Sequence, residues 1–511
     1  MILKVLFFIV AVVGSAIFIA RLTFTIPEIE ERIDTTVLPK ATSGPLAESL
    51  IELEAAHKGL TGIASLQSGA DAFAARILLA DAAVSSIDAQ YYIWHADLTG
   101  TLLLDALVRA ADRGVRVRLL LDDNGTTGID TEIAALVAHP NIEVRLYNPF
   151  NLRTAKILSY GFDFFRLNRR MHNKSFTVDG RATIVGGRNV GDEYFGTGST
   201  PLFVDFDVMA VGDIVPQIAA DFDRYWAALS VYPADLIVGI HKVNDPIGTR
   251  LAGFKGDPQM SEYKAILHSS NIVASLAAGE IDLEWTTAVL VSDDPIKGQG
   301  AVPREDLLAS RLKDAVGDIK TRLDGVSAYF VPGTEGVEAF ATLESRGVDV
   351  RMLTNSMEAT DVLPVHAGYA KRRKAMLESG VELFELRSKA APDARSNRLG
   401  PFGSTGASLH SKTFAIDGER IFVGSFNFDP RSTRLNTEMG LLINSEQMAQ
   451  KVHKAFDEGI NGLAWRIEQR DGKLVWINSN TGSVSTLEPG STILRSIVLT
   501  VIGWLPVEWL L

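Results

Sequence analysis

An internal duplication is the feature that most constrains how this chain can fold. Residues 113–120 (RGVRVRLL) match residues 346–353 (RGVDVRML), and a His-x-Lys-x4-Asp-x6-Gly-x2-Asn motif also occurs once in each half. The motif positions are His172, Lys174, Asp179, Gly186 and Asn189 in the first copy, and His410, Lys412, Asp417, Gly424 and Asn427 in the second. A chain of 511 residues is longer than one hydrophobic core usually sustains. The repeat therefore predicts two tandem domains with one fold.

Each copy has the pattern of a layered α/β unit. A stretch of helical periodicity at residues 101–113 leads into a β-branched run at 115–121. In both motifs an alternating strand pattern ends in Asp-Gly before a second strand, which is a strong hairpin signal. We expect an α/β (α+β layered) fold of two tandem domains related by pseudo-twofold symmetry, each a mixed β-sheet flanked by helices. The expected domains are residues 45–255 and 256–490, with the boundary in the region 253–258.

The N-terminal segment, residues 1–25, is apolar enough to cross a membrane. It carries no charge from Val5 to Ala20, and at about 1.5 Å per residue such a helix nearly spans a hydrocarbon core. The alternatives are a transmembrane anchor and a signal peptide cleaved near Gly14 to Ala16. We favour the anchor because the apolar run continues past these small residues. Lys4, at the leading end, favours a cytoplasmic N-terminus and a body on the extracytoplasmic side.

The C-terminal segment, residues 491–511, is also apolar, but charged residues and a proline interrupt it. Trp504 and Trp509 are typical of a position at the level of lipid headgroups, where an amphipathic ring has apolar and wet neighbours. The sequence fits a segment at the membrane interface and a final helix packed on the body equally well.

The composition excludes several chemistries. The chain has no cysteine, which rules out disulfides, thiolate zinc sites and cysteine nucleophiles. Its net charge of −12 and isoelectric point near 5.3 provide no global positive field for a polyanion. We therefore expect no nucleic-acid partner.

The duplicated motif supplies the groups that displacement at a phosphodiester requires. Histidine and lysine two positions apart on a strand point to the same face, and the glycine turn brings the asparagine beside them. Two copies place two imidazoles around one phosphorus, so that one attacks and the other protonates the departing alkoxide. The lysines and asparagines stabilise the transition state without a metal, and we expect no cofactor. The remaining histidines lack this pattern, and for His366 we favour a structural role over a place in the pocket.

The duplicated motif resembles that of the phospholipase D superfamily, over nearly the whole chain. The segments that carry the resemblance are residues 89–95 (AQYYIWH), 113–123, 354–361, 366–369 (HAGY) and 424–432 (GSFNFDPRS). They are similar to the C-type members of the bacterial cardiolipin synthase branch, which move a phosphatidyl group onto phosphatidylglycerol. The resemblance implies a bacterial inner-membrane enzyme that acts on phosphatidylglycerol, with phosphatidylethanolamine as a further candidate substrate.

The resemblance also implies a role for each site residue. His172 would be the nucleophile and His410 the acid and then the base, although the near symmetry of the site allows the reverse. The residues expected to hold phosphate oxygens are Lys174, Asn189, Lys412, Ser425 and Asn427, with Gly187 in the place of Ser425 in the first copy. Asp179 and Asp417 are expected to brace their hairpins. A downstream acid is placed to orient the histidine of each copy: Asp205, with Asp207 as competitor, and Glu438.

Four arginines precede the histidines and are candidates for anionic headgroups or for solvated loop charges: Arg166, Arg169, Arg170 and Arg398. Among them we select Arg170 as a substrate-binding residue.

Four functions remain to be compared. The leading hypothesis is a phosphatidyltransferase that works through a phosphohistidine. A phospholipase D that gives the same intermediate to water is the nearest alternative, because water and alcohol compete for it. A phosphodiester nuclease is disfavoured by the acidic balance and apolar termini, and a non-catalytic membrane scaffold by the intact motifs in both copies.

Overall fold

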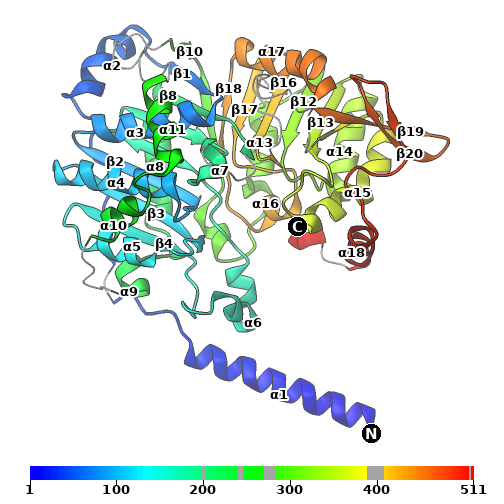
Figure 1. Ribbon diagram of the computed structural model, residues 1–511, viewed down its shortest axis with the longest axis horizontal. Coiled ribbons are helices and arrows are strands. Elements are labelled where there is room, and N and C mark those ends of the chain that lie inside the picture. Colours follow the sequence, from blue (N-terminus) through cyan, green and yellow to red (C-terminus); the bar gives the residue numbers. More distant parts are fainter. Residues whose placement is uncertain are drawn as a thin grey trace.

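The computed structural model describes residues 1–30, 32–196, 203–239, 245–269, 275, 282–387, 408–505 and 508–511. Two α/β halves lie side by side, and a single long helix, α1 (Ile2–Thr23), projects from the body (Figure 1). This arrangement confirms the expected fold of two repeated α/β units.

The first half is built on a nine-stranded mixed sheet of order β10-β1-β8-β6-β5-β2-β3-β4-β9. Its strands are β1 (Thr61–Leu66), β2 (Ser86–Ile93), β3 (Arg116–Gly125), β4 (Ile142–Tyr147), β5 (Ser175–Val178), β6 (Ala182–Gly186), β8 (Asp207–Gly212), β9 (Val231–Pro233) and β10 (Glu284–Thr286). Its helices are α2 (Pro45–Ala56), α3 (Gly69–Ala82), α4 (Leu98–Asp112), α5 (Asp130–Val137), α6 (Lys156–Leu167), α7 (Asp192–Phe195), α8 (Ile214–Trp226), α9 (Ala234–Val238), α10 (Pro246–Gly253) and α11 (Pro258–Ser269).

The second half has a ten-stranded sheet of order β11-β18-β17-β16-β12-β13-β14-β19-β20-β21. Its strands are β11 (Ala288–Ser292), β12 (Arg322–Ser327), β13 (Asp349–Asn355), β14 (Glu382–Leu386), β16 (Lys412–Ile416), β17 (Arg420–Gly424), β18 (Met439–Ile443), β19 (Ala464–Arg470), β20 (Lys473–Asn478) and β21 (Val484–Ser485). Its helices are α13 (Leu308–Val316), α14 (Gly333–Ser345), α15 (Leu363–Glu378), α16 (Pro430–Arg434), α17 (Glu446–Lys454) and α18 (Ile493–Trp504). Short turns of helix are η1 (Pro295–Gly298), η2 (Arg304–Asp306), η5 (Ala455–Gly459), η6 (Ile460–Gly462) and η7 (Glu508–Leu510).

The two sheets repeat the same central order. Strands β8-β6-β5-β2-β3-β4 of the first correspond to β18-β17-β16-β12-β13-β14 of the second, and the last three of each set are parallel. A buried ion pair recurs at the same place, Arg118 with Asp88 and Arg351 with Asp324, each at 2.6 Å. The matching sequences at 113–120 and 346–353 thus form equivalent strands.

The chain passes from the first sheet to the second at Thr287. Strand β10 pairs with β1, and helix α11 packs on α3, so both belong with the first half. The second sheet begins with β11 at Ala288. The change of sheet therefore comes later in the chain than the domain boundary expected at residues 253–258.

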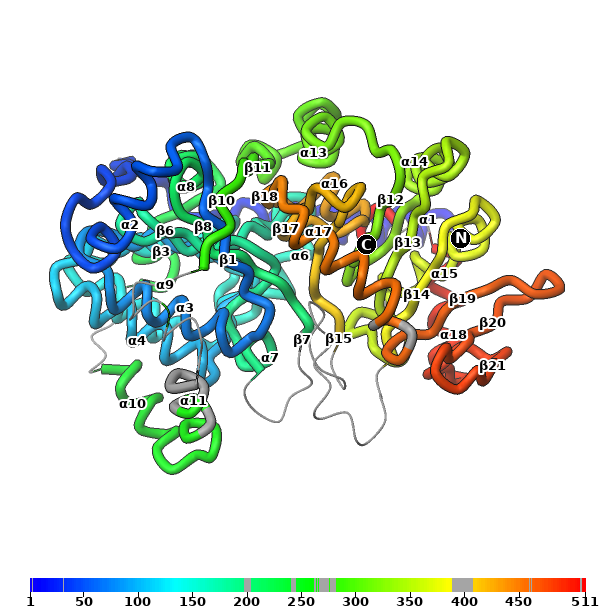
Figure 2. The backbone as a smooth tube through the Cα atoms, turned by 90° about the horizontal axis from the view of Figure 1, so that it is seen from above, coloured from blue at the N-terminus to red at the C-terminus, as the bar shows by residue number. Residues whose placement is uncertain are grey.

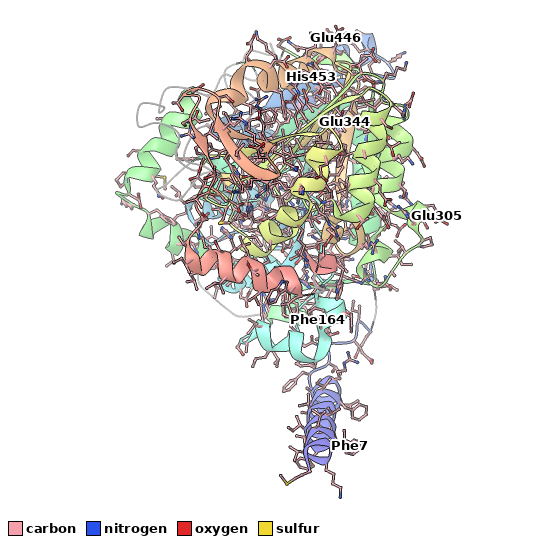
Figure 3. The ribbon with its side chains drawn as sticks, turned by 90° about the vertical axis from the view of Figure 1, so that its right-hand side faces the viewer. Phe7, Phe164, Glu305, Glu344, Glu446 and His453 are labelled. Atoms are coloured by element: carbon pink, nitrogen blue, oxygen red, sulfur yellow. The ribbon has the colours of Figure 1, made fainter. Side chains whose placement is uncertain are left out.

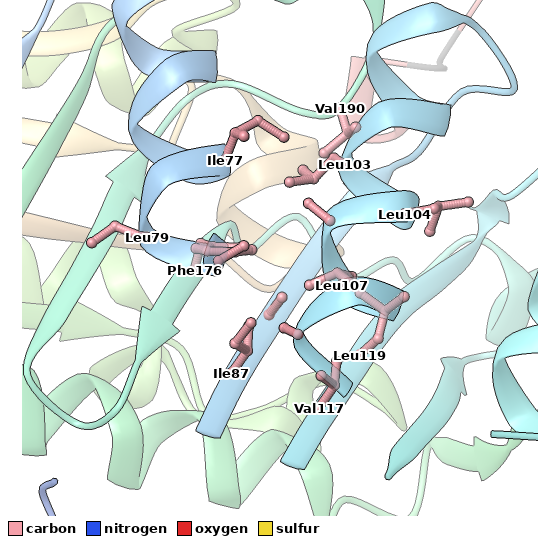
Figure 4. Packing of buried hydrophobic residues seen from close by; sticks show 14 of the residues in the cluster. Ile77, Leu79, Ile87, Leu103, Leu104, Leu107, Val117, Leu119, Phe176 and Val190 are labelled. Carbon is pink, nitrogen blue, oxygen red and sulfur yellow. The ribbon is translucent and has the colours of Figure 1, made fainter. Parts of the chain in front are cut away.

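The core of the first half lies between its helices and its sheet. Ile77 of α3 and Leu103 and Leu107 of α4 pack on Leu119 of β3 and Phe176 of β5 (Figure 4). Apolar residues at helical spacing thus meet alternating strand residues, as the two periodicities require.

A shared hydrophobic cluster joins the halves. It combines Val185 and Val208 of the first sheet with Val423 and Leu441 of the second, all nearly inaccessible to solvent. The tube view shows the two halves lying side by side (Figure 2). The halves therefore form one packed body, which fixes the relative position of the two motifs.

Helix α1 is long and apolar enough to cross a membrane, and its segment Leu3–Thr23 is not buried against the body. At about 1.5 Å per residue its 22 residues extend roughly 33 Å, close to the thickness of a hydrocarbon core.

Candidate active site

Backbone pairing between the halves brings the two motifs together. The His172 N–H donates to the Thr437 carbonyl at 2.9 Å, and the His410 N–H donates to the Val204 carbonyl at 2.8 Å. Beside His410, strand β15 (Ser408–Leu409) pairs in parallel with β7 (Phe203–Val204) of the other half. The histidine of each motif is therefore positioned by the backbone of the opposite copy.

The acids that orient the histidines are exchanged between the copies. Nδ1 of His172 lies 2.8 Å from Oε2 of Glu438, and Nδ1 of His410 lies 2.6 Å from Oδ2 of Asp205. We expected each acid to serve its own copy, and this pairing was wrong because each acid, just ahead of β8 or β18, contacts the histidine of the other copy across the pseudo-twofold axis. A neutral imidazole that donates from Nδ1 keeps its Nε2 lone pair free for chemistry. Neither half contains a complete histidine–carboxylate pair of this site.

Asp205, and not Asp207, is the acid at this position. Asp207 forms a buried ion pair with Arg76 at 2.8 Å, and its other oxygen accepts from the Arg188 N–H. Asp205 Oδ1 is held by the Phe206 N–H at 2.8 Å, which fixes Oδ2 toward His410.

The two lysines place buried positive charge at the site. Lys174 and Lys412 are each 1% exposed, and each donates from Nζ to the carbonyl of the histidine two residues before it. Burial lowers the pKa of Lys174 to about 7, opposed by Glu438 and assisted by repulsion from Lys412. Burial likewise lowers the pKa of Lys412. Two ammonium groups this close and this buried favour an anion between them.

Both histidines are neutral at neutral pH in the free protein. Burial, with the charges of Lys174 and Lys412, holds the pKa of His172 well below its usual range. Burial and Lys412 lower the pKa of His410 to about 4, against the opposing effect of Asp205. Although burial raises the pKa of Asp205, His410 and Lys412 bring it below its ordinary value, whereas burial raises the pKa of Glu438 to about 7. The two histidine–carboxylate pairs are therefore electrostatically different.

The Gly187 and Ser425 difference follows from the shapes of the two acids. A Cβ atom at Gly187 would lie 2.1 Å from Oδ1 of Asp205, so that any other residue there would force the carboxylate to shift. In the second copy the Ser425 hydroxyl donates to Oε2 of Glu438 and accepts from the Met439 N–H. Ser425 thus supports the carboxylate that orients His172, and its expected contact with phosphate oxygens stays a prediction.

The two asparagines tie the glycine turns to the sheet. Oδ1 of Asn189 accepts from the Ile93 N–H at 3.2 Å, and Oδ1 of Asn427 accepts from the Tyr329 N–H at 3.3 Å. Nδ2 of Asn189 also donates to the Tyr194 hydroxyl at 3.0 Å. In this structure Asn189 therefore uses both ends of its amide within the protein, and its expected phosphate contact stays a prediction.

The motif aspartates hold the hairpins. Asp179 and Asp417 have φ of 54° and 55°, and each is followed by a glycine of positive φ. The Asp179 carboxylate accepts from the N–H groups of residues 84–86, and the Asp417 carboxylate from those of residues 320–322. Both carboxylates therefore brace the ends of their strands.

Arg170 is not available to a substrate. It is fully buried, and its nitrogens donate to the carbonyls of Leu167 and Asn148 and to Asp122 at 2.9 Å. The substrate-binding role that we assigned to Arg170 was wrong, because proximity to His172 in sequence does not reveal the carboxylate that captures the side chain.

The other candidate arginines and His366 do not add to the site. Arg166 donates to Asp163 and Asn151, and Arg169 to backbone carbonyls, while Arg398 lies outside the described residues. His366 is buried on α15 and bonded to Glu488 at 2.7 Å, which fits its expected structural role.

Sequence reasoning missed an aromatic and a basic component. The ring of Tyr92 packs edge-on against His172 with centroids 5.1 Å apart, and Tyr194 packs in the same way on His410 at 5.2 Å. Arg431 lies near enough to lower the pKa of His172, although less than burial and the two lysines do. Tyr92 belongs to the segment 89–95 that carries the family resemblance, and Arg431 follows Asn427 by four positions, so both were open to detection.

Within the described residues, one group could hold a metal ion: His95, Asp97 and Glu193, with ligand atoms within 4.8 Å of one another. Asp97 also caps α4 and accepts from the Asp192 N–H at 2.7 Å, so a structural reason for this cluster exists. The expectation of metal-independent chemistry stays a prediction.

Comparison with known proteins agrees with this geometry. The family model described as cardiolipin synthase, PLD-like domain, matches residues 77–226 and 312–460. Cardiolipin synthase C of Escherichia coli is 46% identical over 91% of this chain and 99% of its own length. A cardiolipin synthase of Listeria monocytogenes is 26% identical over 77% of this chain and 67% of its own. A crystal structure of phosphatidylserine synthase from Haemophilus influenzae shares the fold with a TM-score of 0.58 and 17% identity, covering 91% of this chain and all of that one.

The paired motifs in one shared site define a phospholipase D-type phosphatidyltransferase. The chain belongs to the family of cardiolipin synthase PLD-like domains, which its match in both halves shows. One apolar N-terminal helix is consistent with a membrane-anchored enzyme of this family.

Proposed function

We propose that this protein moves a phosphatidyl group onto the hydroxyl of phosphatidylglycerol or a related lipid alcohol, through a phosphohistidine on His172. The observation that carries the proposal is the exchanged pair of histidine–carboxylate contacts beside two buried lysines. The sequence similarity to cardiolipin synthase C of Escherichia coli supports the choice of a lipid acceptor.

In the first step Nε2 of His172 attacks phosphorus, and the bond from phosphorus to the departing alcohol oxygen breaks. His410 gives its proton to that oxygen, so that the alcohol leaves neutral. In the second step His410 takes the proton of the incoming hydroxyl, whose oxygen attacks phosphorus and displaces His172. Lys174 and Lys412 stabilise the charge on the nonbridging oxygens in both steps.

The electrostatics favour His410 as the acid and base. An imidazolium is stabilised by an ionised partner, and the pKa of Asp205 is lowered although burial opposes this, whereas burial raises that of Glu438 to about 7. The bound phosphate diester adds a negative charge near Lys412, which counteracts the depression of the His410 pKa before the first proton transfer.

We further propose that α1 anchors the enzyme in the inner membrane, with the body on the extracytoplasmic side. The charge of Lys4 ahead of the apolar segment supports this orientation. Residues 45–255 and 256–490 would then correspond to the two repeated domains outside the membrane, with 491–511 at its surface.

The test is incubation of the purified protein with phosphatidylglycerol, with and without phosphatidylethanolamine, followed by mass spectrometry of the lipid products. We expect cardiolipin from the wild type and from His139→Asn, a histidine outside the site, and none from His172→Ala or His410→Ala. Phosphatidic acid as the sole product would refute transfer in favour of hydrolysis. Cardiolipin formed by either alanine variant would refute the mechanism.

A further inference from the structure

Helix α6 turns an apolar face away from the protein. Ile157 and Leu158, with Gly161 at helical spacing, are exposed on one side, and Phe165 is exposed beyond a kink at Asp163; the three apolar side chains are 78%, 62% and 71% exposed. Ser159 and Phe162 of the same helix are buried. A helix on a surface that faces water turns its polar side outward and its apolar side to the core. The outward apolar side of α6 therefore indicates an apolar partner.

The end of α1 is attached directly to α6. The Arg21 guanidinium donates from Nε to the Phe162 carbonyl at 2.5 Å, and the rings of Phe24 and Phe162 lie 5.9 Å apart. Figure 3 shows Phe164 of α6 between the body and α1, which carries Phe7. Because Thr23 ends the apolar span, α6 lies at the depth where that span meets the membrane surface.

Helix α18 presents a second apolar stripe on the same side of the body. Ile493, Ile497, Val501 and Trp504 are about half to mostly exposed at helical spacing, while the other side of the helix packs on α15. In Figures 1 and 3 α18 and α6 both lie on the side from which α1 emerges. The helix therefore packs on the body, as the alternative of a final packed helix requires. It also exposes an apolar face, as the membrane-interface alternative requires.

Arg431 connects this side of the body to the catalytic site. Its guanidinium donates to the side chain of Asn168, the residue that ends α6, at 2.9 Å, and to the carbonyl of Leu510. His172 follows Asn168 by four residues. Arg431 thus connects the end of α6 and η7 to the loop that carries the proposed nucleophile.

We propose that α6 and α18 form a docking surface that enters the headgroup region of the leaflet crossed by α1, and that holds His172 beside membrane lipid. The occupant is a lipid bilayer and not a protein, because the surface is continuous with the membrane-crossing helix. This inference rests on the proposed function for its lipid substrate, but the depth of α6 in the membrane is measurable without turnover.

The absence of cysteine makes the full-length chain suitable for single-site labelling. We would reconstitute Leu158→Cys in phosphatidylglycerol–phosphatidylcholine vesicles with an environment-sensitive fluorophore on the new thiol, and use Ile51→Cys on α2, far from α6 in Figure 1, as the matched control. We expect a blue-shifted emission that doxyl lipids quench for Leu158→Cys, and a water-like emission that iodide quenches for Ile51→Cys.

Two outcomes would overturn the docking surface. Equal quenching of both labels by iodide would show that α6 stays in water. A Leu158→Cys label shielded from iodide but not quenched by doxyl lipids would show that a protein, such as a second copy of this chain, covers α6.

Activity provides the second arm. Burial of one large apolar side chain in the membrane strengthens partitioning from water by about tenfold. We would measure turnover on vesicles and turnover on dispersed short-chain phosphatidylglycerol, and we expect Phe165→Asp to lower the ratio of the first to the second by about tenfold. Ile51→Asp should leave this ratio unchanged. A ratio within about twofold of wild type for Phe165→Asp would contradict the proposal. If neither substrate yields product, the proposed function fails, and the fluorescence result still decides the docking surface.

Discussion

Replacing Gly187 by alanine tests whether the exchanged carboxylate is needed for catalysis. A Cβ at this position would lie 2.1 Å from Oδ1 of Asp205, and real Cβ contacts essentially never fall below 3.0 Å, so the carboxylate must move by about 0.9 Å. The 2.6 Å contact from Asp205 to His410 cannot survive such a movement in its present geometry. A displacement of about 1 Å in a catalytic constellation costs on the order of 100-fold in rate, or about 3 kcal/mol in activation free energy.

The assay is cardiolipin formation from phosphatidylglycerol in mixed micelles, with kcat and KM measured separately. We expect kcat of Gly187→Ala to fall about 100-fold while KM changes little, because the substitution displaces the acid and base and adds nothing to the substrate. Gly253→Ala is the matched control, since a Cβ there has no neighbour within 4 Å. Activity of Gly187→Ala within about threefold of wild type would refute the role given to Asp205.

Three further predictions follow from the buried charges. Arg170→Ala should lower the free energy of unfolding by about 3 to 5 kcal/mol, measured by denaturant titration, because it leaves Asp122 buried and unpaired; a stable variant with a raised KM would instead restore the substrate-binding role. Inorganic phosphate should raise the Tm of the wild type by binding between Lys174 and Lys412, and a rise that persists in the Lys174→Met, Lys412→Met double variant would contradict this site. Folding lowers the pKa of His410 to about 4 from 6.5, so the unfolded protein binds more protons between these pH values, and the contribution of His410 to stability is present above pH 6.5 and lost as the pH falls to about 4. His410→Asn should therefore flatten the dependence of Tm on pH in this window. An unchanged dependence would contradict the lowered pKa of His410.

Much of the architecture was open to prediction because the repeat constrains both halves at once. The strands around each motif and the Asp-Gly turns that join them depend on interactions close in sequence. Such local patterns specify hairpins regardless of what packs against them.

The exchange of acids was hidden because it is a property of the pair of domains. Asp205 and Glu438 occupy equivalent positions in the repeat, so pairing within a copy and pairing across copies have the same sequence pattern. Only the packing of the two sheets against each other distinguishes them. The role of Ser425 was missed for the same reason, since its partner Glu438 serves the histidine of the other half.

Arg170 shows a different limit. A charged residue near a motif histidine has the same sequence pattern whether it meets the substrate or a buried carboxylate, and here Asp122 of β3 pairs with it. The exposed apolar face of α6 was likewise indistinguishable from a core-facing stripe until its packing was known.

The most direct test of a shared site with His172 as nucleophile is to identify the residue that carries the covalent intermediate. The enzyme would be mixed with phosphatidylglycerol, quenched within the first turnovers under alkaline denaturing conditions that preserve phosphohistidine, and digested for peptide mass spectrometry. We predict a phosphatidyl adduct on the peptide that contains His172, reduced or lost in Glu438→Gln although Glu438 lies in the other half. An adduct on His410, or one on His172 that forms normally in Glu438→Gln, would contradict the account.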